Sequence, residues 1–159
     1  MKKVNLTIEK KSYNAREAIR TLRTNLQFCG DDKQVILVTS CIPGEGKSSI
    51  AVSLAESIAE MGKSVILVDA DIRKSVMASR LEISDVDKGL SHFLSGQCNL
   101  SDVIYATNIP KFHILLSGPE APNSTELLES KRFSGMLESM KNVYDYIIID
   151  CPPLGLVID

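Results

Sequence analysis

A short segment in the first third of the chain combines glycine, lysine and serine in an order that suits phosphate binding. Glycines let the backbone curl so that its N–H groups point at phosphate oxygens, and a following helix adds the positive end of its dipole. In such a segment Lys47 would reach the β- and γ-phosphates of a nucleotide, and Ser48 would ligate Mg²⁺. The alternative is a tight strand-to-helix turn with a lysine on the surface. The residues predicted to bind ATP are Pro43, Gly44, Glu45, Gly46, Lys47, Ser48 and Ser49.

Three aspartates directly follow apolar runs and could complete a magnesium site. Asp69 and Asp71 come at the end of the run 65–68, and residues two apart in an extended chain share one face. Two nearby carboxylates repel each other unless a cation such as Mg²⁺ lies close. Asp150 ends the run 146–149 and precedes two prolines, an arrangement that delivers one carboxylate to a bound Mg²⁺. The alternatives are a solvated acidic turn for the first pair and a helix-capping aspartate for Asp150.

Apolar periodicity predicts the elements that would position these residues. Residues 12–28 form an amphipathic pattern whose inner face would be Ala15, Ala18, Ile19, Leu22 and Leu26. Strands are predicted at 35–38, 65–68, 112–116 and 146–149, and the first of them is expected to be buried on both faces. A helix with Ile50, Leu54, Ala55 and Ile58 inside should follow the loop 40–49 and end at 61–63. Further helices are predicted near 74–80, 89–95 and 124–140, the last capped by Thr125.

Strands that alternate with helices indicate an α/β fold with a mostly parallel sheet flanked by helices, of the P-loop NTPase type. Because ligands of such sheets bind at the carboxyl ends of the strands, one edge could present all three motifs. We predict one domain over 1–159, with a helical segment at 1–32 and the nucleotide-binding core at 33–159. We also expect further strands of the sheet beyond Asp159.

Composition narrows the class of protein. Hydrophobic residues make up 44% and charged residues 24%, which suits a globular domain with a core. The net charge of -2 argues against a general nucleic-acid-binding surface. The sequence contains no apolar run of about 20 residues and no signal-peptide pattern, so we expect a cytoplasmic protein. Among the four cysteines there is no CxxC pair, which gives a zinc site little support.

Taken together, these motifs resemble a known family, the bacterial tyrosine kinases that control capsule and exopolysaccharide synthesis. The resemblance is carried by Pro43–Ser48, by Leu67–Arg73 and by Ile149–Pro153. Further similarity lies in Glu17–Arg23, which matches the family's ExxRxxR pattern, and in Gly118–Pro119, Pro122–Asn123 and Glu126–Leu128. It implies an enzyme that uses Mg-ATP to phosphorylate protein tyrosines, its own included.

The resemblance also implies a role for each candidate residue. Lys47 and Ser48 would bind phosphates and Mg²⁺, and Asp71 and Asp150 would organise the metal. Asp69 would lie nearest the incoming tyrosine hydroxyl. The implied metal ligands are therefore Ser48, Asp71 and Asp150, and the implied catalytic residues are Lys47, Asp69 and Asp71.

Partners follow from the resemblance as well. Glu17, Arg20 and Arg23 would hold neighbouring subunits in a ring, whereas on physical grounds alone they could be a solvated helix face with charge pairs three residues apart. The family implies a separate transmembrane adaptor that recruits the kinase to the inner face of the membrane, and a cognate tyrosine phosphatase.

The chain departs from related patterns at a few positions. Cys41 stands where the general phosphate-loop pattern has glycine, and Ser124 where the family often has a second proline. Partitioning and cell-division-site ATPases usually carry a second lysine early in this loop, whereas this chain has Ile42 and Pro43 there. A nucleotide-dependent ATPase switch and an ATP-binding adaptor without catalysis stay as alternatives to the kinase.

Overall fold

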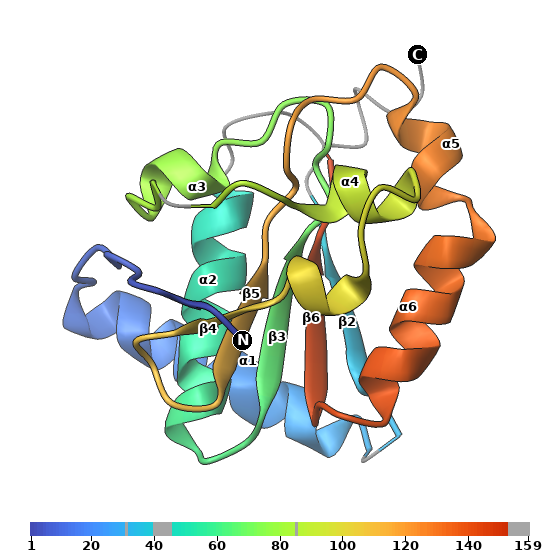
Figure 1. The fold of residues 1–159 in the computed structure, drawn as a ribbon. Helices are drawn as coiled ribbons and strands as arrows, with labels where there is room; N and C mark the ends of the chain where they lie inside the picture. Colours follow the sequence, from blue (N-terminus) through green and yellow to red (C-terminus); the bar gives the residue numbers. More distant parts are fainter. Residues whose placement is uncertain (31, 40–45, 85, 153–159) are drawn as a thin grey trace.

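A sheet between two layers of helices forms the molecule (Figure 1). The structure, a computed structural model, describes residues 1–30, 32–39, 46–84 and 86–152. Its six-stranded sheet has the order β1-β4-β5-β3-β6-β2, with β4 antiparallel to β5 and every other pair parallel. The strands are β1 Lys3–Val4, β2 Val35–Val38, β3 Val65–Asp69, β4 Tyr105–Thr107, β5 Phe112–Leu115 and β6 Tyr146–Asp150. The predicted α/β fold with a mostly parallel sheet is confirmed.

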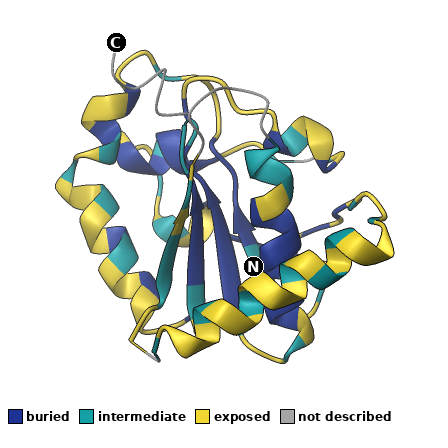
Figure 2. Cartoon of the chain, turned by 180° about the vertical axis from the view of Figure 1, so that it is seen from behind, coloured by how far each residue is buried: buried dark blue, intermediate teal, exposed yellow. Residues whose placement is uncertain are grey.

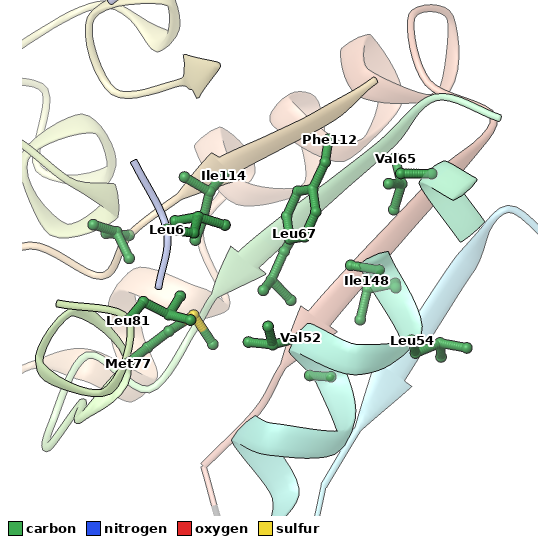
Figure 3. Close-up of a cluster of buried hydrophobic side chains, with 14 of the residues drawn as sticks. Leu6, Val52, Leu54, Val65, Leu67, Met77, Leu81, Phe112, Ile114 and Ile148 are labelled. Atoms are coloured by element: carbon green, nitrogen blue, oxygen red, sulfur yellow. The ribbon is translucent and has the colours of Figure 1, made fainter. Parts of the chain in front are cut away.

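Alternating side chains of the central strands feed two separate cores. On β3, Val65 and Leu67 point to one face of the sheet, and Ile66 and Val68 point to the other. Every residue of β3 is buried, as expected for a strand with a neighbour on each side and helices on both faces. Figure 3 shows the first core, where Leu67 and Phe112 meet side chains of α2 and α3.

The helices divide between the two faces of the sheet. The first face is covered by α2 and α3, with α1 packed against α2. The second is covered by α4, α5 and α6. The helices are α1 Tyr13–Phe28, α2 Lys47–Glu60, α3 Met77–Arg80, α4 Leu90–Leu94, α5 Ser124–Leu128 and α6 Lys131–Lys141, and a short 3-10 helix, η1, spans Leu100–Asp102. No helix in the described ranges is long and apolar enough to cross a membrane.

The first helix starts where predicted but is only loosely buried. Ser12 caps α1 by accepting a hydrogen bond from the Ala15 N–H, 3.2 Å away. None of the α1 residues is buried, and Ala18 and Leu22 of the predicted inner face are exposed. Figure 2 shows this helix lying across the back of the molecule with most of its surface in solvent. The predicted helix is therefore confirmed, but part of its predicted inner face is wrong.

Two predictions, one about β2 and one about α2, need correction. Strand β2 was expected to be buried on both faces, yet it lies at the edge of the sheet and Leu37 is 63% exposed. An edge strand has a neighbour on one side only, so its side chains have fewer packing partners on each face of the sheet. In α2, Ile50 is exposed, because the buried stripe begins one residue later, at Ala51, and continues through Leu54, Ala55 and Ile58.

The single helix predicted over 124–140 is wrong. Ser130 separates α5 from α6: its hydroxyl donates to the Leu127 carbonyl at 2.6 Å and accepts from the Phe133 N–H at 3.4 Å, capping a new helix. Thr125 lies inside α5 and is not a cap. The helices predicted at 74–80 and 89–95 exist in shorter form as α3 and α4, whereas β1 and β4 were not predicted.

Candidate functional site

Three of the predicted site residues meet where α2 begins and β6 ends. Lys47, the first residue of α2, forms an ion pair with Asp150 Oδ1 at the end of β6. The Ser48 hydroxyl donates to the other carboxylate oxygen, Asp150 Oδ2, at 2.8 Å. The pair is almost sealed from solvent, with 8% of the Lys47 side chain and 1% of the Asp150 side chain exposed. Gly46 turns the chain into α2 with φ of 79°, a left-handed conformation that glycine adopts without strain.

Asp69 lies next to this pair on the neighbouring strand. It is paired with Asp150 in the register between β3 and β6, which places the two backbones about 4.8 Å apart. The Ser75 hydroxyl donates to Asp69 Oδ2, and the Asp71 N–H donates to Oδ1 at 3.2 Å. Burial raises the pKa of Asp69 to about 7, and the nearby Asp150 charge acts in the same direction.

Asp71 has a different environment. Strand β3 ends at Asp69, so the alternation of an extended strand no longer orients Asp71. Its Oδ1 accepts a hydrogen bond from the Lys74 N–H at 3.2 Å, and the side chain is half-buried. Burial raises the pKa of Asp71, while Lys47 and Arg73 oppose that shift by their positive charge. Asp71 thus stays within electrostatic reach of Lys47 and Asp150, although the strand geometry that predicted it does not apply.

The site contains two side chains that the motifs did not indicate. Ser75 holds the Asp69 carboxylate, and the Arg80 guanidinium of α3 donates to the Ser49 hydroxyl at 2.8 Å. Neither contact has a signal in local sequence, because each depends on how the segment after β3 folds back over α2. The predicted residues Pro43, Gly44 and Glu45 lie outside the described residues, as does Cys41.

Comparison with known proteins identifies the family to which the chain belongs. A family model described as an AAA domain matches residues 33–159. The tyrosine-protein kinase CpsD of Streptococcus agalactiae is 45% identical over 143 residues, which are 90% of this chain and 62% of that protein. The kinase domain of VpsO is 36% identical with a TM-score of 0.82, and the match covers 89% of this chain and 70% of that domain. The chain belongs to the bacterial tyrosine-protein kinase family.

A more distant relative carries a nucleotide. The septum site-determining protein MinD from Pyrococcus horikoshii, solved with Mg-ADP, is 30% identical with a TM-score of 0.65 over 76% of this chain and 49% of that one. The bacterial tyrosine kinase family and MinD therefore share this fold. The chain spans 62% of the length of its curated CpsD relative.

The donor set at this kinase-family site suits magnesium. Mg²⁺ is usually bound by one or two carboxylates together with phosphate oxygens and water, not by an all-protein cage. Ser48 and Asp150 already lie side by side, and Asp71 lies within electrostatic reach. In the ranges that the structure describes, no three His, Cys, Asp or Glu side chains form a metal-binding group by themselves.

The residues expected to join subunits lie on α1, which packs against α2. Glu17 and Arg20 form an exposed ion pair at 2.8 Å, three residues apart on the helix. Arg23 instead turns inward, where its Nη1 donates to the Ser57 carbonyl at 2.9 Å and to the Ser57 hydroxyl at 3.0 Å. Arg23 therefore ties α1 to α2 within one chain, whereas Glu17 and Arg20 face solvent.

Proposed function

We propose that the protein is a protein-tyrosine kinase that uses Mg-ATP to phosphorylate tyrosines, its own included, and thereby regulates capsule or exopolysaccharide synthesis. The observation that carries the proposal is the meeting of Lys47, Ser48 and Asp150 beside the buried Asp69. Family membership supports the choice of tyrosine as the acceptor, since the curated relative is called a tyrosine-protein kinase.

Nucleotide binding would redistribute the partners of Asp150. Lys47 would leave the carboxylate for the β- and γ-phosphates, with Gly46 and the residues 43–45 supplying backbone N–H groups. Ser48, Asp71 and Asp150 would hold Mg²⁺, which supplies charge neutralisation for the phosphates when it is bound. Ser49 would complete the phosphate-binding segment at the start of α2.

Asp69 would orient the acceptor hydroxyl. Its carboxylate is fixed by Ser75 and by the Asp71 N–H, so it is held in one orientation before any substrate arrives. Tyrosine has a reference pKa near 10, about three units above the pKa of about 7 for Asp69. Full proton transfer before attack would cost about 4 kcal/mol, so Asp69 would take the proton late, as the bond to phosphorus develops.

The test is incubation of the full-length protein with Mg-ATP followed by mass spectrometry for phosphotyrosine. We expect phosphotyrosine in the wild-type protein and none in Asp69→Asn, which should still bind ATP. Absence of phosphotyrosine from the wild-type protein would reject the kinase. Equal loss of ATP binding and transfer in Asp69→Asn would make that residue a metal ligand.

A second candidate is a nucleotide-dependent ATPase switch, which the likeness to MinD favours. Such a protein transfers phosphate to water, so the same incubation would release phosphate without forming phosphotyrosine. An ATP-binding adaptor would do neither. The absence of a second lysine at Ile42 or Pro43 supports the kinase over the ATPase switch.

We also propose partners for the protein, on the basis of its membership of the tyrosine kinase family. A transmembrane adaptor would bring the kinase to the inner face of the membrane, a tyrosine phosphatase would reverse its action, and Glu17, Arg20 and Arg23 would contribute to a ring of identical subunits. Copurification of the full-length protein with membrane proteins, followed by their identification, tests the adaptor directly.

A further inference from the structure

The four tyrosines of this chain differ in how far their rings are exposed on the surface. Tyr13, the first residue of α1, is 68% exposed, whereas Tyr105 and Tyr144 are 4% and 6% exposed. Tyr146 is half-buried at the start of β6, between β3 and β2. Phosphoryl transfer requires that the phenol lie within hydrogen-bond reach of the catalytic groups. A second copy of the protein could therefore reach Tyr13 far more easily than the other three.

The other three tyrosines are held by the fold. The Tyr144 hydroxyl lies 2.7 Å from His113 Nδ1, and burial raises the pKa of Tyr144 to about 12. The Tyr105 ring belongs to the first core, and its hydroxyl donates to the Lys88 carbonyl at 3.5 Å. Tyr146 is paired with β3 in the sheet and packs against the same core. Presenting any of these rings to another molecule would require the core or the sheet to open.

The backbone around Tyr13 can open without disturbing the core. Residues 5–12 belong to no helix or strand, and Figure 1 shows them as a loop at the edge of the molecule. The first turn of α1 is held by Ser12, whose hydroxyl accepts from the Ala15 N–H at 3.2 Å and whose carbonyl accepts from the Arg16 N–H at 3.0 Å. Because no α1 residue is buried, unwinding this turn breaks two hydrogen bonds and exposes no core side chain.

The charges around Tyr13 complement the candidate site. Residues 10–16 carry three positive charges and no negative one, with Lys10 and Lys11 before Tyr13 and Arg16 one turn after it. The candidate site has three aspartates and would hold a triphosphate. Opposite charges speed the encounter of two proteins and favour the correct partner. After transfer, the same basic side chains could pair with the new phosphate, which carries a charge of about -1.5 to -2.

We propose that Tyr13 is a phosphorylation site, modified by the active site of a second copy of the protein. The proposal rests on the proposed kinase function and adds to it one acceptor residue. Tyr13 Oη of the acceptor copy forms a bond to the γ-phosphorus of ATP, and the bond from that phosphorus to the oxygen bridging the β- and γ-phosphates breaks. ADP leaves with that oxygen, and the phenol proton passes to Asp69 of the other copy and then to water.

The first test locates the phosphate in the full-length protein after incubation with Mg-ATP. Cleavage after glutamate releases residues 10–17, a peptide whose only tyrosine is Tyr13. We expect mass spectrometry to find phosphate on this peptide and none on the peptides that hold the other three tyrosines. In Tyr13→Phe the phosphate on residues 10–17 should be lost. That variant should still phosphorylate an added copolymer of glutamate and tyrosine as fast as the wild-type protein, because Tyr13 has no part in the catalytic machinery.

The second test asks whether one copy modifies another. Tyr13→Phe serves as the kinase, and Asp69→Asn, which keeps Tyr13, serves as the acceptor. We expect phosphate on residues 10–17 of the acceptor in the mixture and none in Asp69→Asn alone. Failure of the mixture to phosphorylate this peptide, while the wild-type protein does so, would overturn transfer between copies.

Phe28→Tyr is the matched control, because Phe28 is 84% exposed at the other end of α1 and its immediate neighbours, Gln27 and Cys29, are uncharged. We expect a tyrosine there to be phosphorylated about tenfold more slowly than Tyr13. Equal rates would show that exposure alone selects the acceptor and would overturn the assignment of a site. Circular dichroism and thermal melting establish that each variant is folded.

The outcomes separate this inference from the kinase function itself. If the wild-type protein phosphorylates the copolymer or its own tyrosines elsewhere but leaves residues 10–17 unmodified, Tyr13 is not an acceptor and the kinase function stands. If it phosphorylates neither the copolymer nor itself, the kinase function and this inference are rejected together.

Discussion

The ion pair between Lys47 and Asp150 is both a structural contact and part of the proposed site. Removing two charges from water is expensive, and their attraction offsets that cost only while both partners are present. Asp150 has Lys47 and Ser48 as its partners in the described residues, and nucleotide binding would take Lys47 away. A bound Mg²⁺ would then replace the lost positive charge beside Asp150. Nucleotide and metal binding should therefore be coupled.

Removing Lys47 should destabilise the protein as well as stop phosphate transfer. In Lys47→Met the buried Asp150 carboxylate would lose its charge partner, and we expect a loss of about 3 to 5 kcal/mol in the free energy of unfolding. Urea denaturation without nucleotide measures this. The double variant Lys47→Met/Asp150→Asn removes the uncompensated charge and should recover part of the loss. Equal stability of the single and double variants would contradict the argument.

Asp69 should make stability depend on pH. Its pKa of about 7 exceeds the ordinary aspartate pKa of 3.8, so between these two pH values the folded protein holds a proton that the unfolded chain has released. The free energy of unfolding should therefore fall as the pH rises from about 4 to 7, by up to about 4 kcal/mol at about 1.4 kcal/mol per pH unit. Asp69→Asn, which cannot ionise, should lose this component. Denaturation curves over this pH range without Mg²⁺ test it, and parallel trends in both proteins would refute it.

The helices and strands that can be predicted from sequence are those whose own residue pattern reflects where they lie in the fold. Strands β3 and β6 lie in the centre of the sheet with helices on both faces, so their residues form continuous apolar runs. Each run ends in an aspartate. Strands β1 and β4 are too short to show a pattern, and β1 exists only because Lys3 and Val4 pair with Ala106 and Thr107. The pairing of β1 with β4 joins residues about a hundred positions apart in sequence, which local patterns cannot indicate.

The same distinction between local and long-range contacts applies to the residues of the candidate site. The phosphate-loop and strand-end motifs predicted that Lys47, Ser48 and Asp150 would meet, because each follows from its own strand or helix end. Ser75 could not be predicted, because the segment after β3 is shaped by tertiary contacts. Among them, the Ala70 N–H donates to the Asp150 carbonyl and the Ala121 N–H to the Ile72 carbonyl.

The contact between Gly89 and Gly118 should be essential to the attachment of α4 to the segment that follows β5. A Cβ on Gly89 would lie 2.5 Å from Gly118 Cα and 2.6 Å from the Leu116 carbonyl oxygen, both of them backbone atoms. We expect Gly89→Ala to destabilise the protein by about 1 to 3 kcal/mol. The matched control is Gly135→Ala in α6, where a Cβ meets nothing within 4 Å. That change should stabilise the protein by about 0.5 to 1 kcal/mol, since alanine favours a helix. Thermal melting of both variants measures the two effects, and equal melting temperatures would contradict a tight contact between Gly89 and Gly118.

The exposed side of α1 is where the whole molecule could meet a second copy. Besides the Glu17–Arg20 pair, large apolar side chains of this helix are in solvent, with Phe28 84% exposed. Tyr13 is also exposed, as is Leu22 on the predicted inner face. Charged and apolar groups on one exposed helix suit an interface better than a packed interior.

The ring is best tested at Arg20, because Arg23 has a role within the chain. Arg23→Ala would remove two hydrogen bonds to Ser57 and loosen α1 from α2, so a loss of assembly there would have two explanations. Arg20→Glu breaks an exposed pair worth about 0.3 to 0.5 kcal/mol and should leave the single subunit nearly as stable. We expect this variant of the full-length protein to be monomeric by light scattering in Mg-ATP. Lys33→Glu changes the same charge outside α1, where Lys33 is also exposed, and should keep the wild-type mass. An assembled Arg20→Glu variant would remove this residue from the interface.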